Sequence, residues 1–303
     1  MTPGLAPRMH AVTVNWPAAL GAIVATLAIA ACDEAPTGAQ TASPSAAPSI
    51  QALVVATQLV VGLARVPIGI LDHNTPVADA TVHVRAYAVG GTAQLKSEAD
   101  APFRSEGLQG RGLYVAHLQL DTAGQWLAEV TVLRPGGAAI TVTAPFRVLT
   151  AATVPTVGQA APRSHNLTVN DVRDVSYLDS GTPPDDMHAI SIADAIVQHR
   201  PTLVVFATPA FCASATCGPQ VHAVQSLEAA YRERLTFIHV EIYQDFKPDP
   251  AKRQLTPTVG EWHLESEPWV FLIDRQGIIR AAFEGTAATD ELKQAIDETL
   301  AAT

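Results

Sequence analysis

The sequence predicts a multidomain chain in which an all-β sandwich precedes a C-terminal α/β domain. Residues 51–149 contain strand-like segments, in which apolar residues are β-branched or alternate with polar ones. From about residue 166, apolar strand-like runs alternate with segments of helical periodicity, an order that is typical of α/β folds. The chain has 303 residues, of which 48% are hydrophobic, so two such cores can be built.

The N-terminal segment predicts export and anchoring. Residues 1–31 have a weakly basic start and an apolar run that is short for a permanent membrane helix. The sequence Ile29-Ala30-Ala31-Cys32 resembles a bacterial lipobox, in which the cysteine is lipidated and becomes the mature N-terminus. An ordinary signal peptide with a chance cysteine is the alternative. Residues 32–50, rich in Ala, Pro, Ser and Thr, predict a flexible tether. We expect a lipid-anchored protein on the extracytoplasmic face of a bacterial cell membrane.

Charge and cysteine content narrow the function classes. The net charge is −10, and no stretch forms a basic stripe, which argues against nucleic acid as a partner. The chain has three cysteines, so it is no disulfide-rich scaffold, and each cysteine needs its own explanation.

The β domain is expected over residues 51–149, followed by a linker over 150–165. Its strand-like segments are separated by turn-forming residues and span 66–71, 80–87, 112–120, 125–133 and 139–148. The stretches 71–77, 112–114 and 123–126 resemble the immunoglobulin-like modules of bacterial envelope proteins. The histidines His73, His83 and His117 show no metal-ligand spacing, so we interpret them as ordinary sheet or turn residues. The domain is expected to be a spacer or a docking surface.

The α/β domain is expected over residues 166–303. Ser191 and Asp194 have capping-box spacing, which predicts a helix that runs to about His199. The other predicted elements are strands at 202–207, 235–243, 269–274 and 278–284, and helices at 219–234, 250–263 and 290–300. The resulting order is β-α-β-α-β-β-α.

Two cysteines mark the candidate site. Cys212 and Cys217 lie between the buried strand 202–207 and a helix that Gly218 and Pro219 predict to begin there. A helix N-terminus stabilises a thiolate. On one helix, sulfurs five residues apart would diverge by about 140°, so they can pair only if residues 213–216 form a loop. We expect a Cys212–Cys217 disulfide. Exposure favours Cys212 as the attacking thiolate and the helix dipole favours Cys217; we lean towards Cys212.

The element order, the cysteines and Pro268 before the third strand resemble the thioredoxin-like superfamily. In that family the proline is cis and packs against the cysteines of a Cys-x-x-Cys motif. Here Cys217-Gly218-Pro219 keeps the first three residues, Gln220 replaces the second cysteine, and Cys212 lies upstream. The resemblance implies thiol–disulfide exchange with envelope proteins that carry thiols or disulfides, with Cys212, Cys217 and Pro268 as site residues and no cofactor.

Three other interpretations stay open. The pair can be a structural disulfide in a non-catalytic binding module. The loop also resembles that of Sco-type copper chaperones, which predicts a copper site at Cys212, Cys217 and His263. His222 and His239 are further candidates for that ligand, although His239 lies mid-strand and fits a core residue. Peroxidase activity is disfavoured, because the residue three before Cys212 is Pro209 rather than threonine.

Two further side chains have both a functional and a structural interpretation. Glu241 is either a proton acceptor beneath the cysteines or a strand-end carboxylate in solvent. Trp269 either flanks the sulfur pair or belongs to the core.

Overall fold

A computed structural model of the chain describes residues 49–90 and 94–302. The expected signal segment, the lipidation site at Cys32 and nearly all of the tether over 32–50 lie outside the described residues. Among the described helices, none has both the length and the apolar character needed to cross a membrane. The described residues belong to one compact unit.

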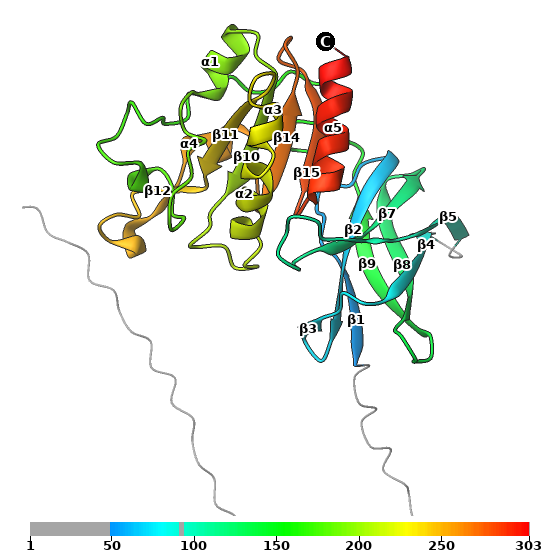
Figure 1. The fold of residues 1–303 in the computed structure, drawn as a ribbon. Coiled ribbons are helices and arrows are strands. Elements are labelled where there is room, and N and C mark those ends of the chain that lie inside the picture. Colours follow the sequence, from blue (N-terminus) through cyan, green and yellow to red (C-terminus); the bar gives the residue numbers. More distant parts are fainter. Residues whose placement is uncertain (1–48, 91–93, 303) are drawn as a thin grey trace, which may run out of the picture. The chain divides into compact units, whose positions relative to one another are not determined.

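The first part of this unit consists of two antiparallel sheets, as the sequence predicts for a β-rich region (Figure 1). The strands of the first sheet, in spatial order, are β1 (Ile50–Val54), β2 (Gly62–Asp72), β7 (Leu113–Leu120) and β6 (Phe103–Arg104), with β3 (Thr75–Pro76) paired to β2. Those of the second sheet are β5 (Gln94–Asp100), β4 (Thr81–Val89), β8 (Gly124–Leu133) and β9 (Ile140–Val148).

One hydrophobic core lies between these two sheets. Burial alternates along β8, in which Trp126 and Val130 are buried, because successive side chains of a strand point to opposite faces. In β2, Val66 and Ile68 contribute to the same cluster of buried residues. The indole of Trp126 donates a hydrogen bond to the carbonyl of Thr122 over 2.9 Å, which satisfies its polar atom inside the core.

The second part is built on a mixed four-stranded sheet in the order β11-β10-β14-β15. The strands are β10 (Thr202–Ala207), β11 (Thr236–Glu241), β14 (Trp269–Ile273) and β15 (Ile279–Glu284). β10 pairs parallel with β11 and antiparallel with β14, and β15 is antiparallel to β14. All residues of β10, β11 and β14 are buried, so this sheet is covered on both faces.

Helices cover both faces of the mixed sheet (Figure 1). The helices are α1 (Ile192–Val197), α2 (Cys217–Gln225), α3 (Glu228–Tyr231), α4 (Pro257–Glu261) and α5 (Thr289–Ala301). Leu203 and Val205 of β10 pack in a cluster with residues of α2, α3 and α5. Val204 and Phe206 point to the other face and pack with residues of α1 and α4. Alternate residues of β10 therefore pack into two different hydrophobic cores.

Several predicted boundaries are confirmed and two predicted helices are wrong. β10 has the expected bounds, and Ser191 caps α1 by accepting a bond from the Asp194 amide. The helix expected over 219–234 begins earlier, at Cys217, and is divided into α2 and α3. At the break, the Ser226 hydroxyl bonds to the Ala223 carbonyl over 2.7 Å and competes with the helical backbone.

The helix expected over 250–263 is replaced by shorter elements. They are the 3₁₀ turn η2 (Pro250–Lys252), strand β13 (Gln254–Leu255), which pairs with β12 (Tyr243–Gln244), and α4. Pro257 lies in the first turn of α4, where its missing N–H is tolerated, and so starts a new helix rather than continuing one. A further 3₁₀ turn, η1 (Val175–Tyr177), lies in the loop before α1.

The predicted linker over 150–165 is held against β15. The Gly158 amide bonds to the Ile279 carbonyl over 2.8 Å, and the Ile279 amide bonds to the Gln159 carbonyl over 2.9 Å. Side chains of the α/β part also bond to the β part. Arg65 pairs with Glu291 at 2.8 Å.

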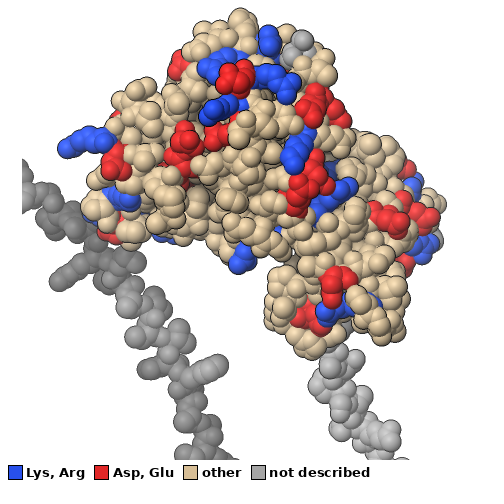
Figure 2. Space-filling view, in the orientation of Figure 1, with Lys and Arg blue, Asp and Glu red and all other residues tan. Residues whose placement is uncertain are grey.

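On the face in Figure 2, Lys and Arg lie among Asp and Glu rather than in one continuous basic patch.

Glu284 is expected to contribute most among these connecting side chains. Its carboxylate accepts bonds from the Thr57 amide (2.8 Å), the Thr57 hydroxyl (2.7 Å) and the Gln58 amide (3.0 Å). Glu284→Ala should therefore lower the free energy of unfolding by about 1–3 kcal/mol, because it removes a charged acceptor from several donors. Urea unfolding measures the loss. Glu284→Gln keeps one carbonyl oxygen and should cost less; equal midpoints for wild type and Glu284→Ala would contradict the assignment.

Candidate functional site

The cysteine loop lies at the carboxyl end of β10. The carbonyl of Thr208 accepts hydrogen bonds from the Phe211 amide (3.2 Å) and the Cys212 amide (3.1 Å), which turns the chain after the strand. Residues 213–216 form a loop, as expected, and α2 begins at Cys217. Both thiols are free in this structure. The Cys212–Cys217 disulfide therefore stays a prediction about the oxidised protein.

The helix N-terminus acts on the sulfur of Cys212 rather than on that of Cys217. The backbone amide of Cys217 donates to Cys212 Sγ over 3.4 Å, and Ser214 Oγ lies 3.2 Å from the same sulfur. Cys212 is partly exposed, whereas Cys217 is fully buried. Exposure and the helix dipole thus both favour Cys212 as the thiolate, whereas the sequence alone predicts that the dipole favours Cys217.

These contacts separate the acidities of the two thiols. Hydrogen bonds to the Cys212 sulfur from the Cys217 thiol, from Ser214 and from backbone amides outweigh its burial and lower the pKa of Cys212 to about 4. The negative Cys212 sulfur and the burial of Cys217 raise the pKa of Cys217 far above its usual value. Cys212 is therefore a thiolate near neutral pH, while Cys217 keeps its proton.

An acidic side chain that the sequence reasoning missed interacts electrostatically with this pair. Glu267 is partly buried, and burial together with the negative charge of Cys212 raises the pKa of its carboxyl. Its charge in turn contributes to the raised pKa of Cys217. Glu267 immediately precedes Pro268, and the peptide bond between them is cis. A signal was present in the sequence, since Glu267 adjoins the proline that the resemblance places at the cysteines.

The other expected site residues have structural contacts. Glu241 is buried and accepts bonds from the amides of Ser180 (3.0 Å) and Tyr243 (3.4 Å), so its carboxylate does not reach solvent. Trp269 is buried and stacks on Phe271, with ring centroids 5.4 Å apart, which fits its interpretation as a core residue.

The residues of the predicted copper site are not gathered into one set of ligands. His263 is exposed and follows Trp262, the C-cap residue of α4. Within residues 49–90 and 94–302, the one close group of three or more candidate ligand side chains contains neither cysteine nor His263. That group consists of Asp179, Asp185, His188 and His239, which we call the Asp–His cluster.

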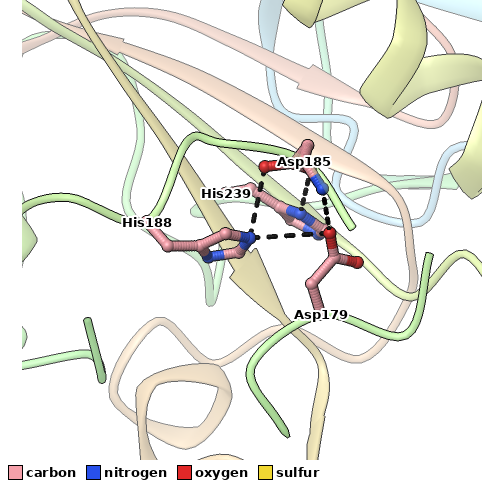
Figure 3. Close-up of side chains that lie close together, drawn as sticks. All are labelled: Asp179, Asp185, His188 and His239. Carbon is pink, nitrogen blue, oxygen red and sulfur yellow. Dashed lines mark hydrogen bonds and ion pairs between the residues drawn. The ribbon is translucent and has the colours of Figure 1, made fainter. Parts of the chain in front are cut away.

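The Asp–His cluster lies in the interior of the α/β part (Figure 3). His239 comes from β11, and the other three residues come from the loop that precedes α1. His188 Nε2 lies 3.2 Å from Asp185 Oδ1 and 3.6 Å from Asp179 Oδ2. His239 Nδ1 lies 2.7 Å from Asp185 Oδ2. Asp185 thus lies between the two imidazoles.

The side chains of the Asp–His cluster strongly shift one another's pKa values. Burial lowers the pKa of His188, but the carboxylates of Asp179 and Asp185 outweigh it and raise that pKa to about 9. Burial likewise opposes the charge of His239, and the Asp185 carboxylate still raises the pKa of this imidazole. The pKa of Asp185 falls well below its usual value, because the two imidazoles beside its carboxylate outweigh the effect of burial.

No protein-family model matches the chain, and the search of curated proteins found no significant match.

Proposed function

We propose that this chain is a membrane-anchored, extracytoplasmic thiol–disulfide exchange protein with a C-terminal thioredoxin-like domain and an N-terminal immunoglobulin-like domain. The observation that carries the proposal is the asymmetry of the cysteine pair. Cys212 is partly exposed and is strongly acidified, and Cys217 is buried beside it with its proton retained. A structural disulfide does not require such an asymmetry, whereas exchange needs an accessible thiolate and a resolving thiol.

The fold assignment has its own support. A central sheet with one parallel and two antiparallel pairs, helices on both faces and cysteines after β10 agree with the resemblance to the thioredoxin-like superfamily. Pro268 precedes β14 and has the cis bond that the resemblance implies. The lipid anchor at Cys32 and the envelope location remain part of the proposal on the strength of the sequence alone.

The proposed reaction has two steps. The Cys212 thiolate attacks one sulfur of a partner disulfide; the partner's S–S bond breaks, a mixed disulfide forms and the second partner sulfur leaves as a thiolate. Cys217 then loses its proton and attacks Cys212 Sγ, which releases the partner's first sulfur. Two electrons pass from the Cys212–Cys217 pair to the partner, and the reverse sequence oxidises the partner instead.

Glu267 is the proposed proton acceptor for Cys217 in the second step. Its carboxyl acts electrostatically on both thiols, and its raised pKa brings its proton affinity closer to neutral pH than that of an ordinary carboxylate. When Cys212 becomes part of a mixed disulfide it loses its negative charge. The pKa of Cys217 should then fall, because its largest cause of elevation disappears.

The pH dependence of alkylation tests the acidified thiol. With iodoacetamide, the reaction rate of Cys212 should be nearly constant between about pH 5 and 8 and should fall as pH drops through about 4, because only the thiolate reacts. Mass spectrometry of the modified peptide assigns the rate to Cys212. Ser214→Ala removes one donor to the sulfur and should move the midpoint to higher pH. A wild-type midpoint near the ordinary thiol value of about 8.5 would refute the proposal.

A further inference from the structure

We propose that Asp179, Asp185, His188 and His239 form a buried binding site for one divalent cation with the coordination preferences of Zn²⁺. The site uses neither cysteine, so it is independent of the exchange function. Its ligand set combines two imidazoles with two carboxylates, and zinc binds both types of group. All four candidate ligand atoms lie within 4.8 Å of one another.

An unpartnered nitrogen points to a ligand at this place. The side chain of His188 is 1% exposed, and its Nε2 has no hydrogen-bond partner in the described residues. Figure 3 shows this nitrogen directed at the carboxylates of Asp179 and Asp185. Burying a polar atom without a bond is costly. A metal ion between the three side chains would satisfy this nitrogen through its lone pair.

His239 is oriented as metal-binding histidines are. Its Nε2 lies 3.2 Å from the carbonyl oxygen of Ala207, which can only accept, so Nε2 carries a proton and donates it. Nδ1 faces Asp185 Oδ2 at 2.7 Å, and its lone pair is available to a cation once its proton is lost. A second ring nitrogen that is fixed by a backbone carbonyl is the usual arrangement around a metal-ligating imidazole.

The carboxylates are also held from outside the cluster. Asp179 Oδ1 accepts a bond from the Gly181 amide over 2.7 Å, and its Oδ2 accepts one from the Asp185 amide over 2.6 Å. Asp185 Oδ1 accepts a bond from the Met187 amide over 2.9 Å. These bonds fix the oxygens without neutralising them, which is what a preformed site for a cation requires.

The two buried carboxylates of the cluster carry two negative charges, which two positive charges would neutralise. Two buried carboxylates need compensation, which either two extra protons on the imidazoles or one divalent cation provides. The two protons would leave His188 Nε2 without a hydrogen bond, because the geometry towards its neighbours forms none. One cation would coordinate all four side chains at once, in exchange for those two protons.

The spacing fits a small tetrahedral ion. Zinc with ligand distances of about 2.0–2.1 Å separates its ligand atoms by about 3.3–3.4 Å. The observed separations from His188 Nε2 to Asp185 Oδ1 and Asp179 Oδ2 are 3.2 and 3.6 Å. His239 Nδ1 lies 2.7 Å from Asp185 Oδ2, which is too close for both atoms to bind one ion, so Asp185 would bind through Oδ1. Two cavities adjoin the cluster. The imidazoles line a cavity of ≈ 190 Å³, and the carboxylates line another of ≈ 360 Å³.

Metal titration of the full chain tests the proposal. A Cys212→Ser/Cys217→Ser background removes the thiols as competing zinc ligands, and the protein is first stripped with a chelator. Competition between the protein and a chromophoric chelator for Zn²⁺ should give one bound ion per chain. Adding His188→Gln should weaken binding by about a hundredfold or more. The matched control, His117→Gln, changes an exposed histidine of β7 and should leave the affinity unchanged.

Cobalt substitution keeps the test decisive where a variant fails to fold. The wild-type chain loaded with Co²⁺ should show visible d–d bands of a tetrahedral ion and no thiolate-to-cobalt charge-transfer band. Binding of less than one Zn²⁺ per chain, equal affinity in the folded His188→Gln variant, or a thiolate charge-transfer band would each overturn the proposal. In the last case the cysteines, rather than the Asp–His cluster, would be the metal ligands.

Discussion

Replacing Cys217 with serine is expected to trap a mixed disulfide between Cys212 and a partner. The Cys212 thiolate keeps its exposure and the backbone N–H of residue 217, so the first attack still proceeds. The second step fails, because a serine hydroxyl cannot resolve the mixed disulfide. Turnover should fall by at least about a hundredfold, while a covalent adduct accumulates in stoichiometric amount.

A peptide disulfide with a fluorophore on one half measures both effects. The label should stay on the Cys217→Ser chain in a non-reducing gel and leave on reduction. Cys212→Ser should lose turnover by a similar factor and should give no adduct, because Cys217 is fully buried and a partner disulfide cannot reach it. The double variant is the control for labelling at other positions. An adduct on Cys212→Ser with none on Cys217→Ser would reverse the assigned roles.

Replacing Asp185 with alanine should destabilise the fold strongly. Asp185 lies against both buried imidazoles, at 2.7 Å from His239 Nδ1 and 3.2 Å from His188 Nε2, and it also accepts the Met187 amide. Its removal leaves buried charge and a buried donor uncompensated. In excess chelator, we expect the free energy of unfolding to fall by about 3–5 kcal/mol.

The neighbouring residue supplies a matched control for that experiment. Asp186 is exposed, and its carboxylate accepts a hydrogen bond from the side chain of Gln225 over 3.1 Å. Burial and the Asp186 carboxylate raise the pKa of the Glu228 carboxyl. Asp186→Ala should change the free energy of unfolding by less than about 0.5 kcal/mol. Urea titrations at the same pH compare the two variants. Equal small losses for both would show that the cluster does not hold the loop over 179–188 to β11.

Local sequence patterns predict much of the fold. The run of β-branched and apolar residues at 202–207 gave the bounds of β10, and the Ser191–Asp194 spacing gave the start of α1. The helices over 219–234 and 250–263 were predicted too long. Their interruptions depend on a single side-chain bond at Ser226 and on the pairing of β12 with β13, neither of which hydrophobic periodicity encodes.

The candidate sites depended more on tertiary contacts. The two cysteines could be identified, because they follow a buried strand and precede a helix. The sequence does not show which of the two sulfurs the helix N-terminus stabilises, because that depends on the hydrogen bond from the Cys217 amide back to Cys212 Sγ. The Asp–His cluster joins His239 to a loop about fifty residues earlier, whereas its position in mid-strand predicts an ordinary core residue.

The reduction potential of the Cys212–Cys217 pair tests the exchange function most directly. The full chain is equilibrated in a series of dithiol redox buffers, the free thiols are alkylated, and the mass shift gives the oxidised fraction. We predict a potential between about −270 and −120 mV, the range of thiol–disulfide oxidoreductases. A potential below about −300 mV, which is typical of structural disulfides, or a pair that never forms a disulfide, would contradict the proposed function.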